Sequence, residues 1–187
     1  MGAHKHSSDA PASEVMTMPY DPNRHHRQSL RLPGYNYAHP GAYFVTICAW
    51  SRGEHFGVVD AEGVHHNTAG QMVAHWWEEV GRKFPCVTLD VFVVMPDHIH
   101  GLIMLGDTPP AQEEQMAVAL GQIVRWFKTM STNAYIRGVN MQGWPAFSGK
   151  LWQRNYHEHV IRDDADMDRV RAYIATNPAR WYSRRAS

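Results

Sequence analysis

The residues with the clearest chemical potential are the triplet His98, Ile99 and His100, which directly follows a Pro96-Asp97 turn. Side chains alternate between the two faces of a β-strand, so both imidazoles would point to one face. Two neighbouring imidazoles make half of a metal site. The alternative is a pair of polar side chains that satisfy their hydrogen bonds on a sheet surface.

A tyrosine and an asparagine form a second pair near the C-terminus, Tyr173 and Asn177. Residues four apart lie on the same face of a helix, one turn apart. Tyr173 could therefore act as a nucleophile at a site where Asn177 offers an oxygen ligand. The alternative is a tyrosine packed on the sheet and an asparagine that caps the end of the helix.

A competing set of reactive residues lies between these pairs. Tyr156 is a rival nucleophile, although no polar ligand follows it one helical turn later. His157 and His159 alternate like the first histidine pair, and two such pairs could build an all-histidine zinc site. A metal-dependent enzyme of another class is therefore a further alternative.

The elements that must position these residues follow from hydrophobic periodicity and turn residues. We expect strands at 42–48, 87–95, 98–105 and 151–161, a hairpin within 55–66, and helices at 67–83, 112–136 and 165–176. The last helix should stop at Asn177, because a residue that precedes proline is disfavoured in helical dihedrals. Strands that alternate with helices around a hairpin predict an α+β fold, a ferredoxin-like sandwich in which helices pack on a central antiparallel sheet.

Length and composition predict a single folded domain. The chain has 187 residues, of which 44% are hydrophobic. We assign residues 1–28, which are polar and aperiodic, to a flexible N-terminal segment and residues 29–187 to the domain. No apolar run is long enough to span a membrane and no secretory signal is evident, so we expect no membrane partner. Cys48 and Cys86 are typical of small core residues in a reducing cytoplasm.

The charge is unevenly distributed although the net charge is zero. Residues 41–120 carry 3 Lys and Arg against 10 Asp and Glu, whereas residues 121–187 carry 11 against 5. Such asymmetry is compatible with a basic face that meets phosphates. The predicted DNA contacts are Arg125, Lys128, Arg154, His159 and Arg162. Each of these could equally be an ordinary surface charge.

Several ordered motifs together resemble the HUH single-tyrosine transposases of the IS200/IS605 type, and most closely the branch called REP-associated tyrosine transposases. The motifs cover most of the chain from about Arg31. They lie at residues 41–46, 67–70, 92–100, 123–128, 151–162 and 173–178.

The resemblance implies a function and a site. His98 and His100 match the metal-binding histidines of the family, Tyr173 matches the nucleophile, and Asn177 matches the third ligand, where related transposases often carry glutamine. The implied cofactor is Mg²⁺ or Mn²⁺. The implied activity is metal-dependent cleavage and rejoining of single-stranded DNA beside palindromic hairpins, through a 5′-phosphotyrosine intermediate.

The resemblance also sets the expected partners and the alternatives. The partners are single-stranded DNA and DNA hairpins, with the protein as a monomer or homodimer in the bacterial cytoplasm, associated with the nucleoid. One alternative is a domesticated protein that binds hairpins without transposition. Another is a metal-dependent hydrolytic nuclease.

Overall fold

A four-stranded antiparallel sheet forms the centre of the fold in the computed structural model, which describes residues 40–106 and 118–185. The strands are β1 (Gly41–Cys48), β4 (Val87–Met95), β5 (His98–Leu105) and β6 (His157–Val160), in the order β4-β5-β1-β6. All described residues belong to one unit, residues 31–187. The segment assigned to residues 1–28 lies outside the described residues.

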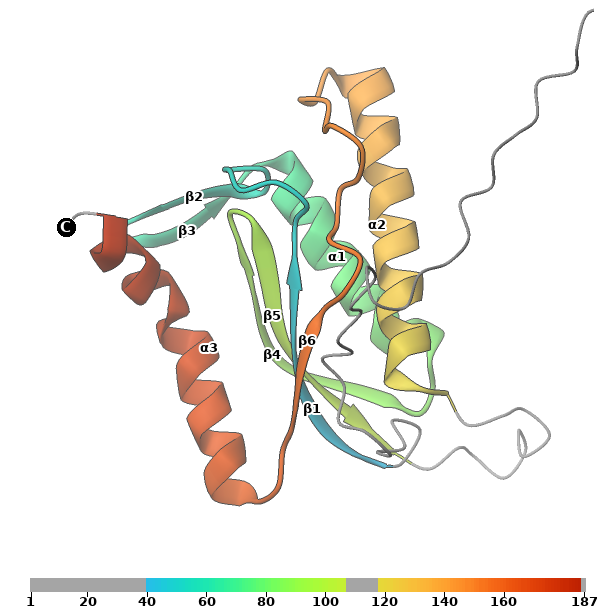
Figure 1. Ribbon diagram of the computed structural model, residues 1–187, viewed down its shortest axis with the longest axis vertical. Coiled ribbons are helices and arrows are strands. Elements are labelled where there is room, and N and C mark those ends of the chain that lie inside the picture. The colour runs from blue at the N-terminus through green and yellow to red at the C-terminus, as the bar shows by residue number, and fades with distance from the viewer. Residues whose placement is uncertain (1–39, 107–117, 186–187) are drawn as a thin grey trace, which may run out of the picture. The chain divides into compact units, whose positions relative to one another are not determined.

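The two faces of the sheet are covered by different helices (Figure 1). Helices α1 (Thr68–Lys83) and α2 (Leu120–Gln142) cover one face, and α3 (Asp164–Arg185) covers the other. The alternation along β1 fits this arrangement, because Tyr43, Val45 and Ile47 are fully buried in the core beneath α1 and α2. The intervening Phe44 packs instead with the cluster beneath α3. The predicted ferredoxin-like α+β sandwich is confirmed.

Helix α1 and the hairpins follow the sequence closely. Asn67 caps α1 by accepting a hydrogen bond of 2.9 Å from the backbone N–H of Gly70. Strands β2 (Gly57–Asp60) and β3 (Gly63–His66) form a separate two-stranded hairpin within the predicted region. Within the described part of the chain, no helix is both long and apolar enough to cross a membrane.

Helix α2 extends beyond its predicted end at residue 136. It continues through Gly138 to Gln142, and Gly143 ends it in a left-handed conformation with φ of 69°. Gly138 is needed inside the helix because the ring of Trp144 packs directly on its Cα, leaving no room for a side chain. The start predicted at residue 112 falls among residues that the structure does not describe.

The predicted strand at residues 151–161 is wrong over its first half. Only His157–Val160 pairs with β1, and a single bridge joins Trp152 to Ala49. The Lys128 ammonium explains the interruption, because it donates hydrogen bonds of 2.9, 3.4 and 3.0 Å to the carbonyls of residues 153, 154 and 155. These carbonyls face α2 and are therefore not available to a strand ladder.

The predicted end of the last helix is also wrong. Helix α3 runs on past Pro178 to Arg185, so Asn177 lies inside the helix and does not cap it. Tertiary contacts compensate for the backbone hydrogen bond that proline removes. Trp181 lies beside His98, with ring centroids 5.5 Å apart, and Arg185 pairs with Glu54 at 3.0 Å.

Candidate active site

A cavity of about 210 Å³ lies between the sheet and α3, next to the β4–β5 turn. Strands β1 and β5 supply its floor and the second half of α3 supplies its wall. The residues that line it are Thr46, Cys48, His98, His100, Tyr173, Asn177, Arg180, Trp181 and Arg184. The four residues that the sequence singled out as nucleophile and metal ligands therefore share one cavity.

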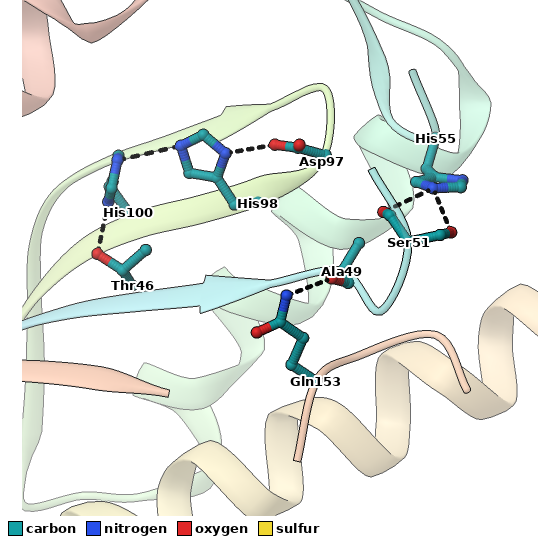
Figure 2. Close-up of polar contacts among 8 residues, drawn as sticks. All are labelled: Thr46, Ala49, Ser51, His55, Asp97, His98, His100 and Gln153. Atoms are coloured by element: carbon teal, nitrogen blue, oxygen red, sulfur yellow. Dashed lines mark hydrogen bonds and ion pairs between the residues drawn. The ribbon is translucent and has the colours of Figure 1, made fainter. Parts of the chain in front are cut away.

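The two histidines point their Nε2 atoms toward each other (Figure 2). Asp97 Oδ1 lies 2.6 Å from His98 Nδ1, and Thr46 Oγ1 lies 2.8 Å from His100 Nδ1. The two Nε2 atoms are 3.1 Å apart. Because each Nδ1 has an oxygen partner, the protons can reside there and leave the Nε2 lone pairs for a cation.

The electrostatics of His100 favour a ligand role. Its side chain is buried, and burial, with a smaller effect of neighbouring His98, lowers its pKa to about 3. His100 is therefore neutral at physiological pH, as a metal-binding imidazole must be.

Helix α3 brings the tyrosine and the asparagine to the histidines. The Tyr173 ring lies 5.3 Å from the His100 ring and 5.8 Å from the Phe44 ring, centroid to centroid. Tyr173 is 37% exposed, so its phenol is accessible from solvent, whereas Asn177 is 8% exposed. No other described residue forms a hydrogen bond with the Asn177 amide.

The donor set fits a divalent cation of the Mg²⁺ or Mn²⁺ type. Two donors at right angles about 2.1 Å from one octahedral ion lie about 3 Å apart, which agrees with the spacing of the two Nε2 atoms. The described residues contain no group of three or more His, Cys, Asp and Glu placed to hold a metal. The Asn177 amide, which lines the same cavity, offers a neutral oxygen donor beside the two imidazoles.

A larger groove of about 730 Å³ separates α2 from the segment at residues 147–156. Four cationic side chains line it, and no described lining residue is acidic. The four are Arg125, Lys128, Lys150 and Arg154. Arg125 and Arg154 are exposed, whereas Lys128 is half-buried and has its pKa lowered to about 8 by burial. The groove is thus a basic surface in which Lys128 mainly supports the loop.

The five predicted DNA contacts do not gather in one place. Arg125, Lys128 and Arg154 line the groove, but His159 and Arg162 lie on the other side of the sheet, toward α3. His159 Nε2 lies 2.8 Å from Asp166 Oδ2, and the backbone N–H of Arg162 donates to the same oxygen over 3.2 Å. His159 also lines a shallow pocket beside Tyr173.

The rival residues lie away from the histidine cavity. Tyr156 is 9% exposed, belongs to the main core and lines the basic groove, with Lys128 Nζ 5.6 Å from its ring centroid. His157 and His159 pair with Thr46 and Phe44 of β1, so a whole strand separates them from the β5 histidines. Pairs two strands apart are about 9.5 Å from each other, too far to share one ion.

Sequence reasoning missed five residues of this site. Thr46 and Asp97 orient the histidine rings, and only the strand register and turn geometry reveal them. Arg180, Trp181 and Arg184 lie beyond the proline at which the helix was expected to end. Their spacings of three, four and seven residues from Asn177 would have placed them on the same face if the helix had been extended.

Comparison with known proteins gives a consistent result. The family model described as Transposase IS200 like matches residues 62–177, a span that includes the histidines, the tyrosine and the asparagine. An uncharacterized protein of Haemophilus influenzae is 34% identical over 182 residues, 89% of this chain and 96% of the relative. A second protein of that organism, named as a REP-associated tyrosine transposase, is 27% identical over 75% of this chain and 71% of its own length.

A similar fold occurs in a solved structure, that of a REP-associated tyrosine transposase bound to a REP hairpin. The TM-score is 0.57 and the sequence identity is 22%, over 80% of this chain and 73% of the other.

Proposed function

Because this chain belongs to the IS200-like transposase family, we propose that it cuts and rejoins single-stranded DNA beside palindromic hairpins, as a REP-associated tyrosine transposase. The observation that carries the proposal is the cavity in which Tyr173 lies beside His98, His100 and Asn177. The relative named as a REP-associated tyrosine transposase supports this branch of the family.

Tyr173 is the proposed nucleophile. Its phenolic oxygen attacks the scissile phosphate, the bond from phosphorus to the 3′ oxygen breaks, and that oxygen takes up a proton as the strand's free 3′-hydroxyl. The phenol loses its proton and the strand's 5′ end becomes a phosphotyrosine. Since one phosphoester bond replaces another, rejoining can follow without ATP.

His98, His100 and Asn177 are the proposed ligands of Mg²⁺ or Mn²⁺, which when bound supplies a Lewis acid that neutralises charge on the phosphate. Nitrogen ligands make Mn²⁺ the better match of the two. Asp97 and Thr46 hold the imidazole rings so that their Nε2 atoms converge.

The basic groove is the proposed binding surface for the hairpin. Its arginines are exposed and the groove has no described acidic lining residue to repel phosphates. His159 lies beside Tyr173, so we assign it, with the neighbouring Arg162, to the single-stranded flank rather than to the hairpin. Affinity for hairpin DNA should fall steeply with salt, because counterion release drives phosphate binding.

The test of the proposal is Tyr173→Phe, with Tyr156→Phe as the matched control. Tyr173→Phe removes one oxygen and keeps the ring contacts with Phe44 and His100, so the variant should fold and bind a hairpin with a single-stranded flank. It should form no covalent adduct, whereas wild type and Tyr156→Phe should. Peptide mapping of a denatured wild-type reaction should place the DNA on Tyr173.

Other results would change the proposal in specific ways. An adduct on Tyr156 would keep the enzyme class and overturn the nucleophile. Cleavage by Tyr173→Phe without any adduct would indicate a hydrolytic nuclease. Hairpin binding by a wild-type protein that never cleaves, with either cation present, would indicate a domesticated binding protein.

A further inference from the structure

Helix α3 contributes two arginines to the cavity in addition to the proposed nucleophile and the proposed metal ligand. Tyr173, Asn177, Arg180 and Arg184 follow one another at spacings of four, three and four residues, which places them along one face of the helix. All four line the histidine cavity. The two arginines lie beyond Pro178 and beyond the span that the family model matches.

Outside this cavity, every arginine of α3 pairs with a carboxylate. The helix has five arginines, and three of them pair with carboxylates: Arg169 with Asp166, Arg171 with Asp90 and Arg185 with Glu54. Arg180 and Arg184 form no ion pair with any described residue. None of the described residues that line the cavity is acidic. Two guanidinium groups without an ion-pair partner, in a cavity whose described lining has no carboxylate, make a site for an anion.

Arg180 has a defined place in this site. Its guanidinium carbon lies 5.6 Å from the centroid of the Tyr173 ring. This cation–π contact keeps the guanidinium next to the phenol without using its N–H donors. The planar guanidinium offers donors in a fork that matches two phosphate oxygens.

We propose that Arg180 binds a nonbridging oxygen of the phosphate that Tyr173 attacks, and that Arg184 binds the next phosphate of the same strand. This inference rests on the proposed function, and it assigns the substrate contacts of the cavity. Since the α3 stripe runs from Tyr173 toward Arg184, the strand would follow the helix across the end of the sheet. Arg180 is then a catalytic residue, because it touches the reacting phosphate.

The experiment is a binding scan in the Tyr173→Phe background, in which no strand is cut. A hairpin with a single-stranded flank is synthesised with a neutral methylphosphonate at one flank position at a time. With Arg180 present, neutralising the bound phosphate should lower affinity about tenfold, the scale of a lost charge-assisted hydrogen bond. With Arg180→Ala, the same substitution should cost little, because the contact is already absent.

Two further variants make the result specific. Arg180→Lys should restore part of the sensitivity at the same position, since it keeps the charge and loses the fork. Arg184→Ala should remove the sensitivity at the adjacent position. Arg171→Ala removes a guanidinium that pairs with Asp90 and does not line the cavity. It should leave the sensitivity to the methylphosphonate unchanged at every flank position.

The outcome separates this inference from the proposed function. Two results would overturn the assignment of Arg180. In the first, Arg180→Ala leaves the effect of the methylphosphonate unchanged at every flank position. In the second, Arg180→Ala removes the effect at a position other than the one that wild type cleaves. If one position loses its sensitivity in Arg180→Ala but wild type never forms an adduct, Arg180 binds a strand phosphate and the proposed chemistry fails.

Discussion

At the scale of single residues, the feature that matters most is the pair of oxygen atoms behind the histidines. Asp97 and Thr46 each contact an Nδ1 atom, and the two Nε2 atoms converge to 3.1 Å (Figure 2). Without these partners each ring could flip or change tautomer, and the pair would no longer present two lone pairs to one point.

Asp97→Asn tests this orienting role. The variant keeps an oxygen near His98 Nδ1 and loses the negative charge that would stabilise a cation bound to the ring. We expect apparent Mn²⁺ affinity to fall about 10- to 100-fold. The Mn²⁺ concentration that gives half-maximal cleavage should rise, and saturating Mn²⁺ should restore the cleavage rate. Asp60→Asn is the control, because Asp60 contacts His65 on the exposed hairpin. An unchanged metal dependence would contradict the role of Asp97.

A pH dependence of stability follows from the burial of His100. Its pKa falls from 6.5 to about 3 on folding. The unfolded chain therefore binds more protons between these values, and stability decreases as pH falls below about 6.5. In metal-free protein this effect should cost about 2 kcal/mol at pH 5, at 1.36 kcal/mol per unit. The free energy of unfolding of His100→Gln, measured by urea denaturation, should fall correspondingly less between pH 7 and pH 5. Equal losses in both proteins would show that His100 protonates freely.

At the scale of elements, strand β5 holds both histidines in position because helix α1 packs against the opposite face of the strand. Gly101 allows this approach, since a Cβ there would overlap the ring of Trp77, which is fully buried in α1. The histidines on the opposite face are thereby set against α3, while Leu102 packs with Val170 and Ile174 of that helix. The position of the site depends on packing in both layers.

The same substitution at two glycines should have opposite effects. Gly101→Ala must push Trp77 or β5 aside, and overpacking of this kind costs about 1 to 3 kcal/mol. Gly81→Ala in α1 meets only ordinary contacts of 3.7 Å with Leu89, so it should stabilise the protein by up to about 1 kcal/mol. Thermal unfolding of both variants checks the signs. A neutral Gly101→Ala would contradict the tight packing of α1 on β5.

At the scale of the whole domain, the two surfaces that we propose for DNA come together near the end of β1. The cavity opens on the α3 face and the basic groove follows α2, on the other side of the sheet. Gln153 joins them, because its backbone N–H donates to Cys48 O over 2.9 Å and its side-chain amide donates to Ala49 O over 3.1 Å (Figure 2). A hairpin in the groove could thus extend its single strand around this edge toward Tyr173.

If the hairpin binds in the basic groove, the arginines of the groove should set how its affinity depends on salt concentration. Arg125→Ala and Arg154→Ala should each weaken hairpin binding and reduce the slope of log affinity against log salt by about one. Lys128→Met should behave differently, because its ammonium is held by three backbone carbonyls and its loss should lower thermal stability. Binding isotherms at several salt concentrations distinguish the two behaviours. If Arg125→Ala and Arg154→Ala leave the slope unchanged, the hairpin binds elsewhere.

The sequence by itself determined the order and type of the elements, because hydrophobic periodicity is a local property. It placed His98 and His100 on one strand face and Tyr173 and Asn177 on one helix face, and these pairs needed only the strand and helix repeats. The family resemblance supplied the roles that we propose for them.

Tertiary structure decided what depends on contacts between distant residues. Packing of Trp181 beside His98 and the ion pair of Arg185 with Glu54 carry α3 past Pro178, against the local preference of the chain. That extension brings Arg180 and Arg184 into the cavity. Likewise, the bonds from Lys128 to three carbonyls turn a predicted strand into the wall of a basic groove. Local propensities differ by about 1 kcal/mol per residue, and by about 3 kcal/mol for proline inside a helix, so several long-range contacts together can overrule them.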